Sequence, residues 1–151
     1  MSISTTVKNQ VIDFIQQQES VQQTYGHVEM NPTGFPAVFV LPDNMEGEFV
    51  DNAHNSRIYA FQITCVFPLG QNMPGLPAGT NRDEYAEETI DTVLDEIINS
   101  LDTNFVLEGI PVLYSNAANI KWGNMDLENG DNKAAQISIR IYTEYQVRST
   151  S

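Results

Sequence analysis

The sequence predicts an α+β fold, with two helices packed on one face of an antiparallel or mixed β-sheet. Apolar residues recur at helical spacing in two segments and alternate with a period of two in several others. These segments follow one another as helix, strands, hairpin, loop, helix, hairpin. A chain of 151 residues, 41% of them hydrophobic, can bury a core without disulfides or metals, so we expect residues 1–151 to form one domain.

Composition excludes several classes of function. The chain has 20 acidic and 7 basic residues and a net charge of −13, which argues against a surface that binds nucleic acid phosphates. Cys65 is the only cysteine, so it cannot form an internal disulfide, and its apolar neighbours predict a buried, inert thiol. No apolar run is long enough for a membrane span, and the first residues do not resemble a signal peptide. We therefore expect a protein of the cytosol or of an assembly built there.

The N-terminal third combines a helix with short strands. The spacing of Val7, Val11 and Ile15 predicts a helix over about 5–18, and the polar stretch after it predicts a short strand at 21–25 and then a turn. Residues 35–41 are apolar and β-branched, which predicts a strand that has Pro36 at its start or on an edge. A turn at 43–47 and residues 48–51 predict a hairpin whose return strand is 57–67.

The return strand has two distinct faces. One face is strongly apolar and predicts the core side, whereas the other is mixed. The apolar face carries Tyr59, Phe61, Ile63, Cys65 and Phe67. A long loop at 68–82, rich in Pro and Gly, follows this strand and keeps Met73 and Leu76 as its apolar residues.

The second helix is the clearest element of the sequence. Asn81 and Glu84 resemble a capping box, and an apolar stripe runs from there to about residue 101. The stripe consists of Ala86, Ile90, Val93, Leu94, Ile97 and Leu101. The opposite face carries Glu84, Glu88, Asp91, Asp95 and Asp102. Because these acids form a long row rather than an isolated pair beside apolar residues, a solvated helix face explains them better than general acid and base catalysis.

The last third predicts a hairpin with one very long strand. Residues 112–114 and 118–125 predict one interrupted strand or two short ones, and Asn129 with Gly130 marks a turn at 126–132. Residues 134–147 alternate cleanly and would extend for roughly 45 Å. We expect a strand of this length to bend or to pair with something outside the domain. A short polar tail at 148–151 ends the sequence.

Motifs that carry chemistry are weak. His27 and His54 lie in polar turns and have no second ligand at helical metal-site spacing, and residues 126–131 depart from a calcium loop at Gly130. The nucleotide-binding glycine motifs and the G-x-S-x-G nucleophile motif do not occur. The sequence therefore predicts no enzyme, no metal and no cofactor. A small-ligand-binding module, or an enzyme with a dispersed site, stays open as an alternative.

Taken together, five segments resemble the small tail terminator, or tail completion, proteins of long-tailed bacteriophages. They are an N-terminal helix, Gly34–Val40, Tyr59–Phe67, Glu87–Ile98 and Ala135–Tyr142. The resemblance covers most of the chain and rests on the order and length of elements rather than on an invariant motif. It implies a structural virion protein of the tail and neck, assembled in the host cytoplasm. Such a protein forms a hexameric ring that caps the tail tube and docks the head connector.

Features read from the residues themselves supply candidate roles within this picture. The partners of such a protein would be further copies of itself, the tail tube protein and the head–tail connector proteins, with DNA passing through the ring unbound. Candidate assembly contacts are Met73, Leu76, Arg140, Tyr142 and Glu144. Glu84, Glu88, Asp91 and Asp95 would face the lumen, where like charge repels passing DNA, or else a solvated outer wall. A related neck role, as a head completion or stopper protein, remains an alternative.

Overall fold

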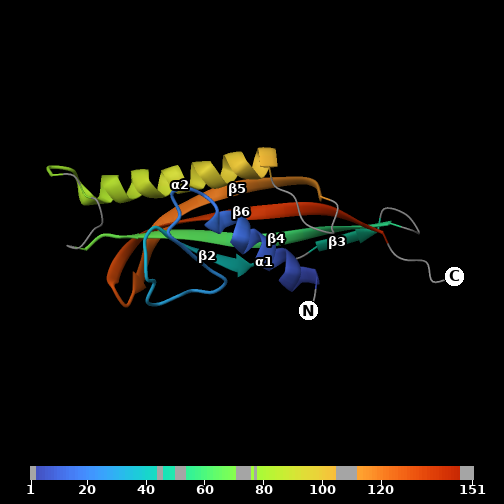
Figure 1. Cartoon of the computed structure of the whole chain (residues 1–151), viewed down its shortest axis with the longest axis horizontal. Coiled ribbons are helices and arrows are strands. Elements are labelled where there is room, and N and C mark those ends of the chain that lie inside the picture. Colours follow the sequence, from blue (N-terminus) through green and yellow to red (C-terminus); the bar gives the residue numbers. More distant parts are fainter. Residues whose placement is uncertain are drawn as a thin grey trace.

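The computed structural model describes residues 3–43, 46–49, 54–70, 76, 78–104 and 112–146. Figure 1 shows an elongated molecule in which long strands run beside the second helix. The elements in chain order are α1 (Ile3–Gln16), β1 (Gln23–Tyr25), β2 (Ala37–Pro42), β3 (Glu46–Phe49), β4 (His54–Pro68), α2 (Arg82–Asn104), β5 (Val112–Leu127) and β6 (Gly130–Gln146).

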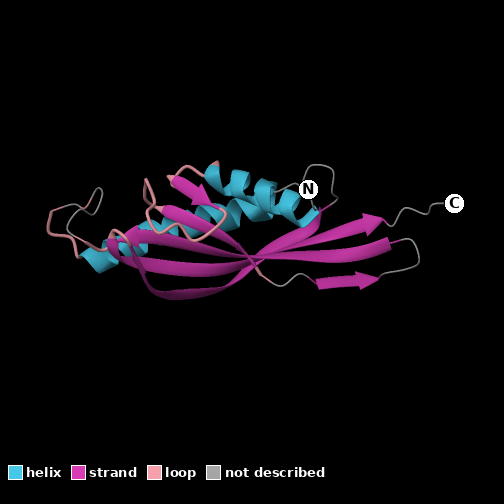
Figure 2. Cartoon of the chain, turned by 90° about the horizontal axis from the view of Figure 1, so that it is seen from below, coloured by secondary structure: helices cyan, strands magenta, loops and turns pink. Residues whose placement is uncertain are grey.

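The strands of the described residues form one six-stranded mixed sheet. The order is β1-β2-β4-β6-β5, and β3 pairs with β4 beyond the end of β2. Among the described strands, only the β1–β2 pair is parallel. Both helices lie on the same side of the sheet in Figure 2, and both contribute to one core cluster. The predicted α+β fold, with two helices on one face, is therefore confirmed.

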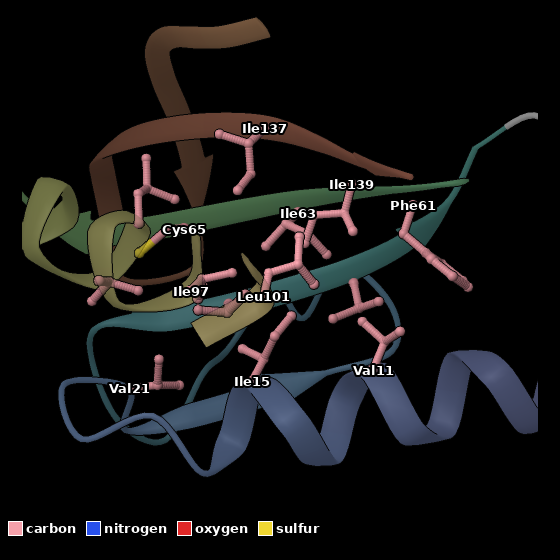
Figure 3. Packing of buried hydrophobic residues seen from close by; sticks show 14 of the residues in the cluster. Val11, Ile15, Val21, Phe61, Ile63, Cys65, Ile97, Leu101, Ile137 and Ile139 are labelled. Atoms are coloured by element: carbon pink, nitrogen blue, oxygen red, sulfur yellow. The ribbon is translucent and has the colours of Figure 1, made fainter. Parts of the chain in front are cut away.

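The main core lies between the helices and the sheet, as the close view in Figure 3 shows. Val7, Val11 and Ile15 point from α1 into this core, and the whole predicted stripe of α2 is buried. All five residues predicted for the apolar face of β4 are buried as well. Hydrophobic burial on this face is the dominant stabilising term, because it removes most of the large apolar side chains from water.

Two sets of polar contacts fix the ends of the helices. The Asn81 side chain accepts a hydrogen bond from the Glu84 backbone N–H at 3.1 Å, which confirms Asn81 as the N-cap of α2. After α1 ends, the backbone N–H of Ser20 donates to a carboxylate oxygen of Glu96 at 3.0 Å, and the Ser20 hydroxyl donates to the other oxygen. The Ser100 hydroxyl donates to the Gln18 side chain at 3.0 Å. These contacts join the turn after α1 to α2.

The long final strand finds its partners inside the chain. One edge of β6 pairs with β4 over residues 132–146, and the other pairs with β5 over residues 130–143. The sequence predicts that this strand either bends or pairs outside the domain, and β4 and β5, which are almost as long as β6, supply its partners inside the chain. Figure 1 also shows the strand curving toward its hairpin, which agrees with the other expectation, a bend.

The hairpin between β5 and β6 turns where the sequence predicts it. Gly130 has a φ of 110°, in the left-handed region that favours glycine. Asn132 is fully buried and its side-chain N–H groups donate to the Gly130 carbonyl at 3.0 Å and to the Asn129 side chain at 3.0 Å. β5 is one strand rather than two short ones. The expected break at 115–117 is absent, because these residues pair in register with β6; the register shifts instead between 112 and 114 and between 118 and 121.

Element boundaries differ modestly from the expected ones. α1 begins and ends two residues earlier than predicted, and the first strand starts at Gln23. β3 starts at Glu46, inside the segment expected to turn, because its backbone already pairs with Ile58 of β4. Residues 44–45, the middle of that expected turn, lie outside the described part of the chain.

A second, smaller apolar cluster lies on the opposite face of the sheet. It contains Phe39, Val66 and Leu127, with Tyr25 and Phe35 packed against it. The segment after β1 reaches this face, where the Met30 carbonyl accepts a hydrogen bond from the Glu128 N–H at 2.8 Å. The sequence predicts only a turn here, since the segment is polar and its few apolar residues show no periodicity.

One buried polar atom in β1 provides a stability test. The Thr24 hydroxyl is buried and has no hydrogen-bond partner among the described residues, and Thr24 pairs in register with the core residue Val38. Because an unpaired buried hydroxyl is unfavourable, we expect Thr24→Val to raise the free energy of unfolding by about 1 kcal/mol in urea denaturation. Thr64→Val is the control, since the Thr64 hydroxyl accepts a hydrogen bond from Gln136 and its loss should destabilise. A lower stability of Thr24→Val would contradict this account.

Candidate assembly surfaces

The acidic face of α2 lies on the outside of the molecule. Glu84, Glu88, Asp91 and Asp95 are all exposed, and they lie opposite the buried stripe of the same helix. Asp83, in the first turn, pairs with Lys133 of β6 at 3.2 Å. The arrangement confirms a solvated row of charge; whether it lines a ring lumen stays a prediction. The side chain of Asp102 lies outside the described residues.

The sheet face away from the helices carries two of the predicted assembly contacts. Arg140 is exposed on this face and Tyr142 is half-buried. The residues between them along β6, such as Ile139 and Ile141, point to the opposite face and are buried in the core. The side chain of Glu144 is outside the described residues. Gln136 donates a hydrogen bond to Gln62 at 3.0 Å across β6 and β4. We call this surface the bare face; its described central side chains are Gln62, Thr64, Lys121, Gln136, Ser138, Arg140 and Tyr142, none of them acidic.

The other two predicted contacts belong to the long loop. Met73 lies outside the described residues. Leu76 is half-buried and packs against the main core, so at least part of this side chain stabilises its own subunit. The sequence misses this packing because the loop lacks any apolar period that would point Leu76 inward.

The outer strand β5 exposes two large apolar side chains that the sequence does not single out. Ile120 is 47% and Trp122 40% exposed, and β5 ends the sheet, so its outer edge pairs with no described strand. The Lys133 ammonium lies 5.9 Å from the centre of the Trp122 ring. Lys133 also pairs with Asp83 in the first turn of α2, so its ammonium contacts both the Trp122 ring and this helix. Trp122 lies on the helix-covered face of the sheet, because its register partner Ala135 belongs to the main core. It stays partly exposed at the edge strand β5.

A cavity of about 360 Å³ opens between α1 and the sheet near the end of β2. Its apolar walls come mainly from Pro42, Tyr59 and Phe61, whereas Lys8 and Asp43 supply opposite charges. The Lys8 ammonium donates a hydrogen bond to the Gly26 carbonyl at 2.7 Å. A smaller cavity of about 190 Å³ lies on the bare face, over Gly123, Ala134 and Gln136.

Chemically reactive side chains are not brought together in the part of the chain that is described. Burial raises the pKa of the Cys65 thiol far above its ordinary value, so the nucleophilic thiolate is suppressed. His27 is exposed and lies 2.9 Å from a Glu29 oxygen. Among the described residues, no three metal-ligating side chains are grouped to hold an ion, and no helix is both long and apolar enough to cross a membrane.

The comparisons with known proteins establish the fold. The sequence matches no protein-family model, and it matches no curated protein. The structure is similar to that of a chain in the virion of a native gene transfer agent particle, with a TM-score of 0.51 and 12% sequence identity. The similarity covers 95% of this chain and 96% of that chain.

Proposed function

We propose that this chain is a structural virion protein, a tail terminator that forms a hexameric ring on the tail tube. The ring stops elongation of the tube and offers a docking face to the head connector. The fold shared with a virion component over 95% of the chain carries the proposal. The resemblance of five segments to phage tail terminators supports the more specific role. A non-enzymatic role is consistent with the inert Cys65 thiol.

In such a ring, the acidic row and the candidate contact residues would have different roles. The acidic row Glu84, Glu88, Asp91 and Asp95 would face the lumen, and like charge would keep DNA from binding while it passes. Arg140, Tyr142 and Glu144 on the sheet, with Met73 and Leu76 on the long loop, would contact neighbouring copies or the tube and connector proteins. A head completion or stopper role would use the same surfaces with a different partner.

A second candidate function comes from a different class. The cavity of about 360 Å³ between α1 and the sheet falls within the size range of small-ligand sites. A monomeric protein that binds a small molecule there would need no ring. The two functions differ in assembly state, which decides between them.

The proposed ring predicts that the protein caps tail tubes. We expect negative-stain images of purified tail tubes, mixed with a saturating amount of this protein, to show a ring at one end of each tube. Free subunits need not assemble alone, because the tube end provides the template. Tubes that stay uncapped at saturation, with the protein monomeric in sedimentation, would contradict the terminator role and favour the ligand-binding alternative.

A further inference from the structure

The described sheet has open edges at two opposite sides, one along β5 and the other along parts of β2 and β3. The outer edge of β5 is open along the described residues 112–127 and bears exposed Ile120 and Trp122. At the other side, β1 covers only residues 37–39 of β2, so residues 40–42 of β2 and all of β3 have no described strand beyond them. Long open edges with apolar side chains favour pairing with another strand.

The cavity between α1 and the sheet opens at this second edge. Pro42, which lines it, is the last residue of the uncovered stretch of β2, and the N–H of the next lining residue, Asp43, donates a hydrogen bond to the Ala60 carbonyl of β4 at 2.9 Å. Tyr59 and Phe61 belong to the helix-covered face of the sheet. The cavity therefore lies on the helix side of the open edge.

Trp122 lies on the same side of the sheet at the other edge. It pairs in register with Ala135, a residue of the main core, and its ring lies beside Lys133, which reaches α2. If the sheet of one copy continued into the sheet of the next, Trp122 would meet the face of its neighbour that carries the cavity. The bare faces of both copies would stay on the opposite side.

We propose that Trp122 of one copy inserts into the cavity between α1 and β2 of the next copy, joining the two open edges. This inference rests on the proposed ring. The occupant is a second copy because one chain supplies both an exposed indole at one open edge and the cavity at the other, on the same side of the sheet. A large aromatic side chain entering an apolar pocket is the common form of a dominant interface contact.

The chemistry of the cavity suits an indole. Pro42, Tyr59 and Phe61 provide apolar walls, and the volume of about 360 Å³ is large enough for the whole ring system. Lys8 can place its ammonium near the ring, and the Asp43 carboxylate can accept a hydrogen bond from the indole N–H. Here one surface of each copy binds a different surface of the next copy. Such a head-to-tail interface forms a closed ring when the successive rotations between copies add up to a full turn.

Strand levels give the contact a defined offset. Across the sheet, Trp122 of β5 is in register with Ala135 of β6, which is in register with Cys65 of β4. Pro42 of β2 is in register with Phe61, which lies four residues from Cys65 along β4. Joining Trp122 to the cavity therefore staggers each copy against the next. A stagger of this kind accompanies strands that tilt against the axis when a sheet closes on itself.

The test uses Trp122 as its own reporter, because it is the only tryptophan of the chain. Sedimentation velocity and tryptophan emission are followed over a protein concentration series, with and without purified tail tubes. We expect the emission to shift to the blue as the ring forms. Trp122→Ala should weaken association at least about tenfold. Thr5→Phe, which fills the cavity from an exposed position on α1, should weaken it similarly.

Val28→Ala and Met30→Ala are the matched controls, because these side chains are exposed to 40% and 47% but lie on neither edge. Both should assemble as the unmodified protein does, and thermal melts should confirm that all four variants fold. Rings that form from Trp122→Ala or Thr5→Phe, or without an emission shift, would overturn the inference and leave the ring itself intact. Protein that never assembles, even on tube ends, would overturn both the inference and the proposed function.

Discussion

Ile139→Ala is expected to lower the free energy of unfolding by about 3 to 4 kcal/mol. The Ile139 side chain is completely buried at the middle of β6, where its register partners are Phe61 of β4 and Ala117 of β5. In Figure 3 it points into the core beside Ile63. Truncation would remove buried apolar surface and leave a cavity that rigid neighbouring strands cannot close, and such substitutions typically cost 2 to 5 kcal/mol.

Urea denaturation followed by circular dichroism measures this loss. Arg140→Ala is the matched control, because Arg140 is the next residue of the same strand and its exposed side chain lies on the bare face. We expect that change to alter stability by less than about 0.5 kcal/mol. Equal effects of the two substitutions would mean that β6 does not separate a core face from a solvated face.

Periodicity explains why most of the fold is predictable from the sequence. The α2 stripe and the faces of β4 and β6 follow strict periods, so the buried side of each is fixed by neighbouring residues alone. The cap at Asn81 and the turn at Gly130 are local as well, because each depends on a few adjacent residues. The fold class follows from the order of these elements.

Contacts between distant segments explain what the sequence misses. The parallel β1–β2 pair, the crossing of residues 26–36 to the bare face and the pairing of β6 with β4 all depend on segments that are separated in the chain. The cavity near Pro42 forms only when α1, β2 and β4 come together. A periodic pattern describes one element at a time and does not show which elements pack together. Neither the cavity nor the proposed contact with Trp122 could therefore be predicted from the sequence.

The candidate site is predictable only in part for the same reason. The exposure of the α2 acids follows from helical spacing, and that of Arg140 from strand alternation. Leu76 packs on the core from within a loop, where no period indicates a direction. What each exposed surface contacts in an assembly depends on a second molecule, so the sequence of one chain does not predict it.

Replacing Glu84, Glu88, Asp91 and Asp95 together with Lys is expected to turn a surface that is indifferent to DNA into one that binds it. Each substitution changes the charge by two, so the net charge of the chain moves from −13 to −5, with four cations along one exposed row of α2. The fold should persist, because exposed charges each contribute little to stability. If the row lines the lumen, DNA inside the ring would lie within reach of these cations, since charges act over only about 8 Å at physiological salt.

Gel-shift experiments on assembled rings distinguish the lumen from the outer wall. Linear DNA can thread a closed ring, whereas covalently closed circular DNA cannot. We therefore expect quadruple-Lys rings to retain linear DNA and to ignore the circle, with binding that falls steeply as salt rises, because phosphate contacts release counterions. A quadruple variant with Gln and Asn at the same positions is the control, since it removes the acids without adding cations. Equal binding of both DNA forms would place the row on the outer wall of the ring. If neither form binds, the row does not contact DNA in the ring, and the lumen assignment is wrong.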